Sequence, residues 1–222
     1  MIKIELTEVF GWDAAIRGMR NPKNSWDKSD SYWTHIENPE TLNTAPFQFF
    51  MGENDHKLAM TLANAGNDHG KFLRMIVVYC DVTGPLYWYK ELDTYRAGVE
   101  KNSCSTMHKI HAKPFVIEDF SVEHLREMAI TTFKKVLRLL NVYRNYYLEQ
   151  KDKSYWWQLI QLLPSSYNQR RTYMFSYAAL RNIYHARRHH KLDEWHTFCD
   201  WITTLPYSEL ITGTGGDTDV RP

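Results

Sequence analysis

The first half of the chain alternates between short segments of regular hydrophobic spacing and polar connections. Residues 1–9, MIKIELTEV, alternate apolar and polar side chains, which predicts a strand, and residues 11–20, GWDAAIRGMR, predict a short helix. Residues 21–47 combine proline, asparagine, serine and aspartate with scattered aromatic rings, which predicts an irregular but packed connection. Asn54 then predicts the start of a helix that runs to about residue 65 and ends at Gly66.

The clearest strand signal lies in the middle of the chain. Residues 72–82, FLRMIVVYCDV, are rich in β-branched side chains and predict a strand. Gly84 and Pro85 end it. Pro85 also suits the first turn of a helix over residues 85–96, PLYWYKELDTYR, because the first helical turn needs no backbone donor.

Beyond residue 120 the hydrophobic spacing becomes helical. Ser121 is a candidate N-cap for a long amphipathic helix, because apolar residues follow it at steps of three and four. Those residues are Val122, Leu125, Ala129, Phe133, Val136, Leu140, Tyr143 and Tyr147. Residues 154–163 predict a shorter helix that stops at a proline, a further helix is predicted from near Asn168, and residues 191–205 predict another.

Together these elements predict a single α+β domain over residues 1–212, with a small β-sheet packed with several helices and a helical C-terminal half. The content of 43% hydrophobic and 24% charged residues is that of an ordinary globular domain, which excludes a disordered or collagen-like chain. Residues 213–222, GTGGDTDVRP, have little to bury and predict a flexible tail.

Charge and cysteine content narrow the function classes. Lysine and arginine number 27 against 26 acidic residues, so no overall field draws the chain to nucleic acid, and any anion site must be local. No apolar run is long enough to span a bilayer and the first residues lack a signal-peptide pattern, which predicts a soluble, cytoplasmic protein without a membrane partner. Three cysteines without CxxC spacing predict reduced thiols.

Two arginines stand in line with apolar helix stripes. Arg187 follows a stripe after Pro164, and Arg96 follows Tyr89 and Leu92 on the earlier predicted helix. The stripe before Arg187 is Tyr173, Tyr177, Leu180 and Tyr184. An inward guanidinium needs a carboxylate, a phosphate or a ring edge to offset its desolvation. Each arginine is therefore either half of a structural ion pair or part of a site for a phosphorylated ligand.

A resemblance favours the second interpretation. Residues 84–109, GPLYWYKELDTYRAGVEKNSCSTMHK, resemble the signature region of flavin-dependent thymidylate synthases (ThyX). In that family a proline and an aromatic helix precede Arg-His-Arg-x-x-Ser-x-Asn-x-x-Ser-x-Arg-Tyr. The distance from Pro85 places residues 94–96, Thr-Tyr-Arg, on Arg-His-Arg, so that Arg96 alone is kept. With one inserted residue, Asn102 and Ser105 match the family's Asn and second Ser, while its final Arg-Tyr becomes Met-His at residues 107–108.

Two more segments resemble the same family. Residues 162–195 are similar to its C-terminal pattern, in which a Leu-Pro pair precedes a helix with an asparagine and a nucleotide-binding arginine; Asn182 and Arg187 match these two. Residues 62–72, LANAGNDHGKF, resemble its Gly-His segment, with His69 as the counterpart of the family histidine. The order and spacing of the three segments agree over most of the domain.

The resemblance implies reductive methylation of dUMP, or a related deoxynucleotide, with FAD as cofactor and methylene-tetrahydrofolate and NADPH as co-substrates. It also implies a homo-oligomer, a tetramer in this family. Arg187 is the implied catalytic residue, since a planar guanidinium can hold the uracil edge. The implied substrate-binding residues are Arg187, Asn102, Ser103 and Ser105. The implied cofactor-binding residues are His69, Arg96 and Asn182.

The departures from the family pattern keep alternatives open. Two signature cations are replaced by Thr94 and Tyr95, which favours, as the main alternative, an inactive nucleotide-binding or structural oligomer. Replacement charge could come from Lys101, Lys109 or Arg181. Basic and aromatic residues also alternate as they do on RNA-binding surfaces, but the balanced charge favours core packing of these rings.

A histidine cluster suggests one more kind of site. His185 and His189 are one helical turn apart, with His190 and His196 nearby, as metal ligands can be. No third ligand is fixed at the required spacing, so a polar helix end is the simpler interpretation and no metal is predicted.

Overall fold

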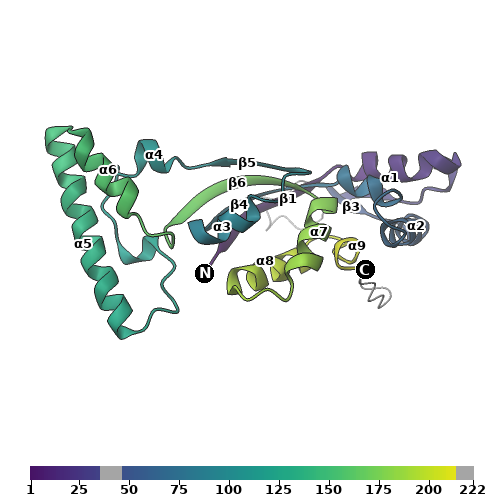
Figure 1. The fold of residues 1–222 in the computed structure, drawn as a ribbon. Helices are drawn as coiled ribbons and strands as arrows, with labels where there is room; N and C mark the ends of the chain where they lie inside the picture. Colours follow the sequence, from purple (N-terminus) through teal and green to yellow (C-terminus); the bar gives the residue numbers. More distant parts are fainter. Residues whose placement is uncertain (36–46, 214–222) are drawn as a thin grey trace.

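In the computed structural model, which describes residues 1–35 and 47–213, four strands form one antiparallel sheet at the centre of the molecule (Figure 1). In spatial order they are β1 (Lys3–Phe10), β4 (Val77–Pro85), β6 (Asn168–Ser176) and β5 (Val99–Ser103). β4 pairs with β6 along its full length, from Val77 opposite Ser176 to Pro85 opposite Asn168. The predicted strands at residues 1–9 and 72–82 therefore correspond to β1 and β4.

Six of the described helices and this sheet enclose the main core. They are α1 (Trp12–Arg20), α2 (Glu53–Asn64), α3 (Leu86–Leu92), α7 (Tyr177–Arg187), α8 (Asp193–Thr203) and α9 (Glu209–Thr212). In Figure 1, α1 and α2 lie at one end of the sheet, whereas α3, α7 and α8 lie along one side of it. Alternate β4 residues Val78, Cys80 and Val82 are buried beneath them, and the Trp88 and Trp195 rings meet edge to face 5.2 Å apart. This arrangement confirms the predicted α+β class.

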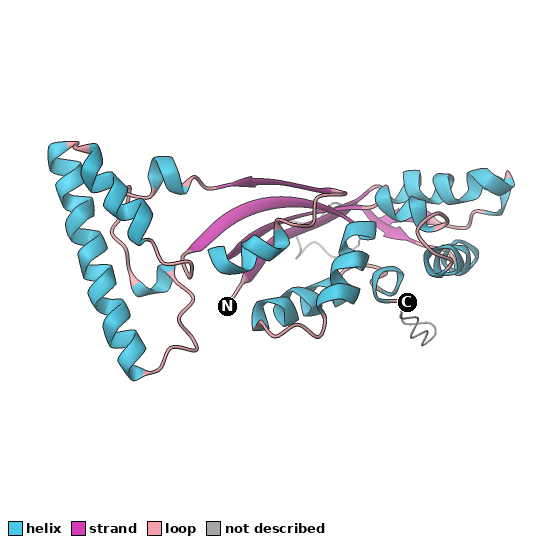
Figure 2. Cartoon of the chain, in the orientation of Figure 1, coloured by secondary structure: helices cyan, strands magenta, loops and turns pink. Residues whose placement is uncertain are grey.

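A second, smaller core joins three helices into what we call the helical arm (α4, Thr106–Lys109; α5, Glu127–Gln150; α6, Lys153–Leu162). The arm lies at one end of the molecule, beyond the ends of β5 and β6 (Figures 1 and 2). The prediction that Ser121 caps the long helix is wrong, because α5 begins at Glu127. The Ser121 hydroxyl instead donates to the Asn168 side chain at the start of β6.

The prediction of a helix from near Asn168 is also wrong, since β6 occupies residues 168–176 and α7 begins only at Tyr177. Inward β6 positions hold polar side chains, which hides the alternation expected of a strand. Arg171 is one of them. Its guanidinium stacks 3.7 Å from the centre of the Tyr89 ring and pairs with Asp93, so a charge is buried where the pattern predicted none.

The connection between α1 and α2 is more regular than predicted. Two short 3₁₀ turns (Asn21–Lys23 and Trp26–Lys28) precede a small sheet of β2 (Tyr32–His35) and β3 (Phe47–Phe50). The remaining 3₁₀ turns are Gly70–Arg74 and Ile117–Asp119. Residues 36–46 of this connection and residues 214–222 of the predicted tail lie outside the described residues.

The start of α2 is fixed from a distance in sequence. Its N-cap is Gly52 rather than Asn54, and the Asp30 carboxylate accepts hydrogen bonds from the backbone N–H groups of Asn54 and Asp55. A local pattern around Asn54 could not reveal a capping group that lies 24 residues away. None of the described helices is long and apolar enough to cross a membrane.

Candidate functional site

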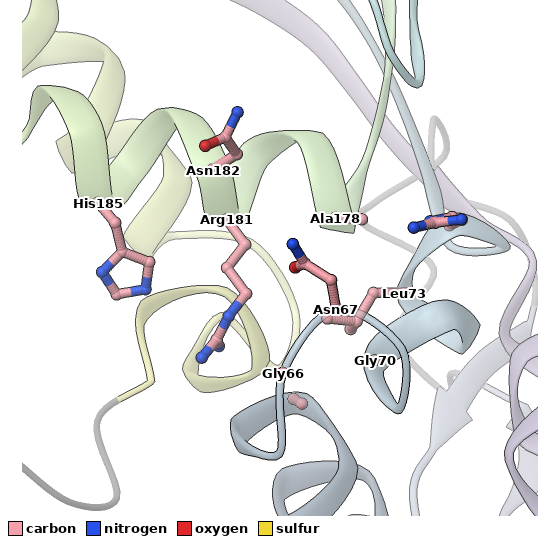
Figure 3. A pocket seen from close by; sticks show the side chains of 10 residues that line it. Gly66, Asn67, Gly70, Leu73, Ala178, Arg181, Asn182 and His185 are labelled. Carbon is pink, nitrogen blue, oxygen red and sulfur yellow. The ribbon is translucent and has the colours of Figure 1, made fainter. Parts of the chain in front are cut away.

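A cavity of about 240 Å³ lies between α7 and the turn that follows α2 (Figure 3). Polar and small side chains line it, and no carboxylate is among them. The lining residues are Ala63, Gly66, Asn67, Gly70, Leu73, Arg74, Ala178, Arg181, Asn182 and His185. Two segments that the sequence resemblance selected separately, residues 62–72 and residues 162–195, therefore meet at one cavity.

The turn is shaped by its glycines. α2 ends at Asn64, and Gly66 follows with φ of 95°, a backbone conformation that favours glycine, so the predicted helix end is confirmed. The Gly66 carbonyl then accepts hydrogen bonds from the backbone of His69 and Gly70. His69 is exposed on this turn, beside the cavity but not among the side chains that line it.

Arg181 is the most unusual group in the cavity. Its guanidinium donates to the carbonyl oxygens of Leu210 and Ile211 and to the Asn64 side chain, with no carboxylate partner in the described part of the chain. Burial lowers the pKa of Arg181. A half-buried cation with only neutral acceptors favours an anion in the adjoining cavity.

His185 lies one turn after Arg181 and shares its electrostatic environment. Burial lowers the pKa of the His185 imidazole, and the nearby charges of Arg181 and Arg188 lower it further. Figure 3 shows Arg181 and His185 extending from the same side of α7, with Asn182 leaving the helix at the other edge. The cavity therefore combines the charge of Arg181 with an imidazole whose charged form is disfavoured.

Arg187 faces away from this cavity. Successive residues of an α-helix are about 100° apart, so Arg187 lies roughly 140° around α7 from Asn182 and about 180° from Ala178. Asn182 and Arg187, which the sequence assigned to cofactor and substrate, thus leave α7 in nearly opposite directions.

Arg187 has partners of its own within the chain. Its Nη1 donates to Glu91 Oε2 at 2.8 Å and its Nε donates to the Tyr95 hydroxyl at 2.8 Å. The same Glu91 oxygen accepts from Trp195 Nε1, and the guanidinium lies 5.0 Å from the Trp195 ring. Arg187 is therefore half of an ion pair, with a side chain 22% exposed. Its Nη2 makes no hydrogen bond within the described residues.

The prediction that Arg96 lies on an inward helix face is wrong. α3 ends at Leu92 instead of continuing to residue 96, and Arg96 is exposed in the turn before β5. Its charge has no ion-pair partner among the described residues. The helical spacing failed here because Asp93 begins a turn immediately after the last buried leucine.

Asn102 and Ser103 lie on β5, at the edge of the main sheet, rather than in a loop. They are exposed and line a shallow groove with Cys104, Arg170 and Thr172. Ser105 follows at the start of α4, where its hydroxyl accepts a hydrogen bond from the backbone N–H of His108.

Apart from Arg96, the sequence-based site residues therefore lie in three places on one chain. Asn182 and the His69 turn adjoin the cavity, Arg187 lies with Glu91, and Asn102, Ser103 and Ser105 follow the sheet edge. Sequence reasoning missed Asn67, Arg74 and Glu91. The spaced glycines of the turn could have drawn attention to Asn67, whereas Glu91 looks like an ordinary helix-surface acid.

Fold and site together define an α+β protein with a central antiparallel sheet, a helical arm and a cavity that favours an anion. Neither a protein-family model nor a curated protein sequence matches the chain. Several solved structures, in contrast, are similar to the chain. ThyX from Helicobacter pylori, a flavin-dependent thymidylate synthase complexed with FAD and dUMP, is similar with a TM-score of 0.65 and 17% identity. The likeness covers 95% of this chain and 98% of that one.

A second structure of the H. pylori protein with FAD and dUMP agrees, with a TM-score of 0.65 and 15% identity over 96% of this chain and 98% of that chain. The UMP/dUMP methylase PolB from Streptomyces cacaoi, bound with 5-Br dUMP, is similar with a TM-score of 0.66 and 14% identity. That likeness covers 97% of this chain and 96% of the other. The chain has the ThyX fold along almost its whole length, which confirms the resemblance at the level of the fold.

Proposed function

We propose that this chain is a flavin-dependent enzyme that methylates dUMP or a closely related pyrimidine nucleotide, with methylene-tetrahydrofolate as carbon donor and NADPH as reductant. One observation carries the proposal. On a fold shared with proteins solved with FAD and dUMP, the half-buried Arg181 lines a cavity, and no carboxylate of residues 1–35 or 47–213 pairs with it. A nucleotide phosphate has the charge that this guanidinium lacks.

The cavity residues fit part of a flavin nucleotide. A volume of about 240 Å³ lies below the 300 Å³ or so that a drug-sized ligand needs, so one chain can hold one end of FAD and not all of it. Arg74 and Arg181 provide charge, Asn67 and Asn182 provide amide groups, and Gly66 leaves room for close approach. These groups suit a pyrophosphate and the polar edge of a ring.

Bound FAD would supply the reducing equivalent for the methyl group, and the chain would supply position and charge. Arg181 and Arg74 bind phosphate oxygens, and Asn182 donates a hydrogen bond at the cavity edge. His69, at the tip of the turn, covers the approach to the flavin. Arg96 is exposed and does not line the cavity at Arg181, so it would bind a cofactor phosphate only outside that cavity.

Arg187 binds the nucleotide through Nη2, the nitrogen that Glu91 and Tyr95 leave free. Because Glu91 and the Trp195 ring hold the guanidinium plane, the free edge is oriented before the nucleotide arrives. Asn102, Ser103 and Ser105 add neutral hydrogen bonds. The Ser105 oxygen accepts from His108, which leaves its own O–H to donate.

A complete site requires more than one copy of the chain, because the three groups of site residues do not meet within one. Apolar surface is available for association. Phe10 and Tyr79, on the sheet face opposite the helices, are 48% and 43% exposed, and Met128 on α5 is 84% exposed. We propose a homo-oligomer, a tetramer as in the family that the sequence resembles.

At micromolar concentration, light scattering is expected to give the mass of an oligomer, which is larger than the 26.4 kDa of a single chain. The physical reason is that exposed apolar surface on the sheet face and on α5 is removed from water when copies associate. Tyr79→Glu, which places a charge on the sheet face, is expected to shift the distribution toward monomer, and Lys57→Glu at an exposed position of α2 is the control. A wild-type protein that stays monomeric would contradict a shared site.

A second candidate function is a nucleotide-binding or structural oligomer without catalysis. It is favoured by the partners of Arg187, because Glu91 neutralises this charge and Tyr95, which replaces the family histidine, binds it. A visible spectrum of protein purified with added FAD separates the candidates, as only the enzyme requires bound flavin. An assay of dUMP methylation with methylene-tetrahydrofolate and NADPH then tests turnover.

Arg181→Gln is expected to weaken flavin binding by about 1.5–3 kcal/mol, the usual contribution of a hydrogen bond to a charged group. Glutamine keeps donors for the carbonyls of Leu210 and Ile211, so the fold is preserved while the charge is removed. The measurement is a titration with FAD followed by quenching of flavin fluorescence. Arg138→Gln, at an exposed arginine of α5 in the helical arm, is the control. Equal affinity in the two variants would contradict the role of Arg181.

A further inference from the structure

The helical arm has a cavity of its own, of about 340 Å³, which the proposed flavin and nucleotide residues do not line. It lies where α4, the end of α5 and the start of α6 meet, at the end of the molecule away from α1 and α2 (Figure 1). Its lining combines basic and aromatic side chains. The residues used below are His108, His111, Tyr147, Lys151, Lys153 and Trp156.

Positive charge gathers at this cavity without compensation. Lys151 and Lys153 line it, and Lys109 and Arg144 lie close enough to act on His111. None of these four cations forms an ion pair within the described part of the chain. The acid between the two lysines, Asp152, caps α6 by accepting from the Ser154 backbone. A cavity with unpaired cations and no lining carboxylate attracts an anion.

His111 supports the same conclusion from geometry. Its Nδ1 atom is buried and has no hydrogen-bond partner, and its ring meets Tyr147 edge to face at 4.9 Å. Buried polar atoms are nearly always paired, so this nitrogen has a hydrogen-bonding capacity that the described chain does not use. Burial lowers the pKa of His111, and Lys151, Lys109 and Arg144 lower it further, which shows how positive its surroundings are.

Backbone and ring geometry hold the other groups in place. Lys151 ends α5 with φ of 55°, in the left-handed region where glycine is the favoured residue. The ammonium group of Lys151 lies 5.9 Å from the centre of the Tyr147 ring, which also lines the cavity. Lysine therefore occupies this position despite the strain of a left-handed backbone. Trp156 donates from Nε1 to the Met107 carbonyl, which fixes an aromatic face on the opposite wall.

We propose that this cavity binds a phosphate group, either free or carried by a nucleotide whose base stacks on Trp156. Lys151 and Lys153 bind the phosphate oxygens, and the His111 imidazole lines the same cavity. The site is independent of the proposed function, because it shares no residue with the flavin cavity or with Arg187.

Calorimetry with pyrophosphate as the probe tests the site in flavin-free protein that carries Arg181→Gln, because the cavity at Arg181 also suits a pyrophosphate. This protein is expected to bind saturably, and addition of Lys151→Gln/Lys153→Gln is expected to weaken binding at least roughly tenfold, as loss of charge-assisted hydrogen bonds implies. The matched control is Lys134→Gln/Lys135→Gln, which removes the same charge from exposed positions of α5. No saturable binding, or equal weakening in both double variants, would overturn the proposal.

Two further titrations identify the source of the phosphate. UMP that binds more tightly than pyrophosphate, with the difference lost in Trp156→Ala, assigns the cavity to a nucleotide, whereas equal affinity assigns it to free phosphate. Uridine binding as tightly as UMP in wild type and in the lysine variant would show that the phosphate is not recognised, and would overturn the proposal. The ring C–H signals of His111 in the NMR spectrum are expected to shift with pyrophosphate, and their constancy would place binding elsewhere.

Discussion

Asp55→Asn is expected to lower the free energy of unfolding by about 3–5 kcal/mol, because it leaves the buried charge of Arg20 without its carboxylate. Asp55 is fully buried and Arg20 is 4% exposed. The Arg20 Nε lies 2.5 Å from Asp55 Oδ1. The other Asp55 oxygen accepts from the hydroxyls of Ser29 and Ser31 and from the backbone of Asp30 and Ser31.

This carboxylate connects three parts of the N-terminal half. Arg20 is at the end of α1, Asp55 is in the first turn of α2, and the Arg20 guanidinium also donates to the carbonyls of Ser25 and Lys28 between them. Loss of the charge therefore weakens a hydrogen-bond network rather than one contact.

Urea unfolding followed by circular dichroism measures the change. Asp68→Asn is the control, since Asp68 is exposed and is expected to change stability by no more than about 0.5 kcal/mol. If Asp55→Asn does not fold, the double variant Arg20→Met/Asp55→Leu is expected to recover a folded protein, because apolar residues need no charge partner. A loss below about 1 kcal/mol in Asp55→Asn would contradict the assigned role.

The same carboxylate makes stability depend on acid. Burial alone raises the pKa of Asp55, but hydrogen bonds from Ser31, Ser29 and Arg20 outweigh burial and the pKa lies below its ordinary value. The contribution of Asp55 is therefore fully present above the unfolded-state pKa of about 3.9, and it is lost as pH falls through the lower folded-state pKa. The difference in stability between wild type and Asp55→Asn should shrink as pH falls below about 4.

Arg187→Ala is expected to weaken dUMP binding by about 2–5 kcal/mol, the usual loss when one partner of a hydrogen-bonded, desolvated charge pair is removed. The free Nη2 and the aromatic faces of Tyr95 and Trp195 provide the reason, because they present an oriented donor to a planar base. Calorimetry with dUMP measures the effect, and Arg188→Ala, at the exposed residue that follows α7, is the control.

Glu91→Gln distinguishes binding from a merely structural ion pair. Without the carboxylate the charge of Arg187 is no longer neutralised, while the glutamine oxygen can still accept from Nη1, so dUMP affinity is expected to rise. If Arg187 serves the fold alone, both Arg187→Ala and Glu91→Gln will lower the unfolding temperature and leave dUMP affinity unchanged. That result would also favour the oligomer without catalysis.

Side-chain periodicity was enough to predict the elements whose spacing is unbroken. The β-branched run of β4 and the apolar steps along α5 indicate which side of each segment is buried. This indication does not depend on which segment packs against it. The ThyX resemblance likewise rested on local order and spacing, and the fold agrees with it. A period of two or of 3.6 residues is a property of one segment, so one segment is sufficient to show it.

Contacts between distant segments could not be read in this way. Arg171 can face inward on β6 because it stacks on Tyr89 and forms an ion pair with Asp93, which is 78 residues earlier in the sequence. Arg187 likewise pairs with Glu91, which is 96 residues earlier. The cavity at Arg181 exists only because α7 packs on the turn after α2. Burying a charge is favourable only when its partner is in place, and the folded chain alone brings those partners together.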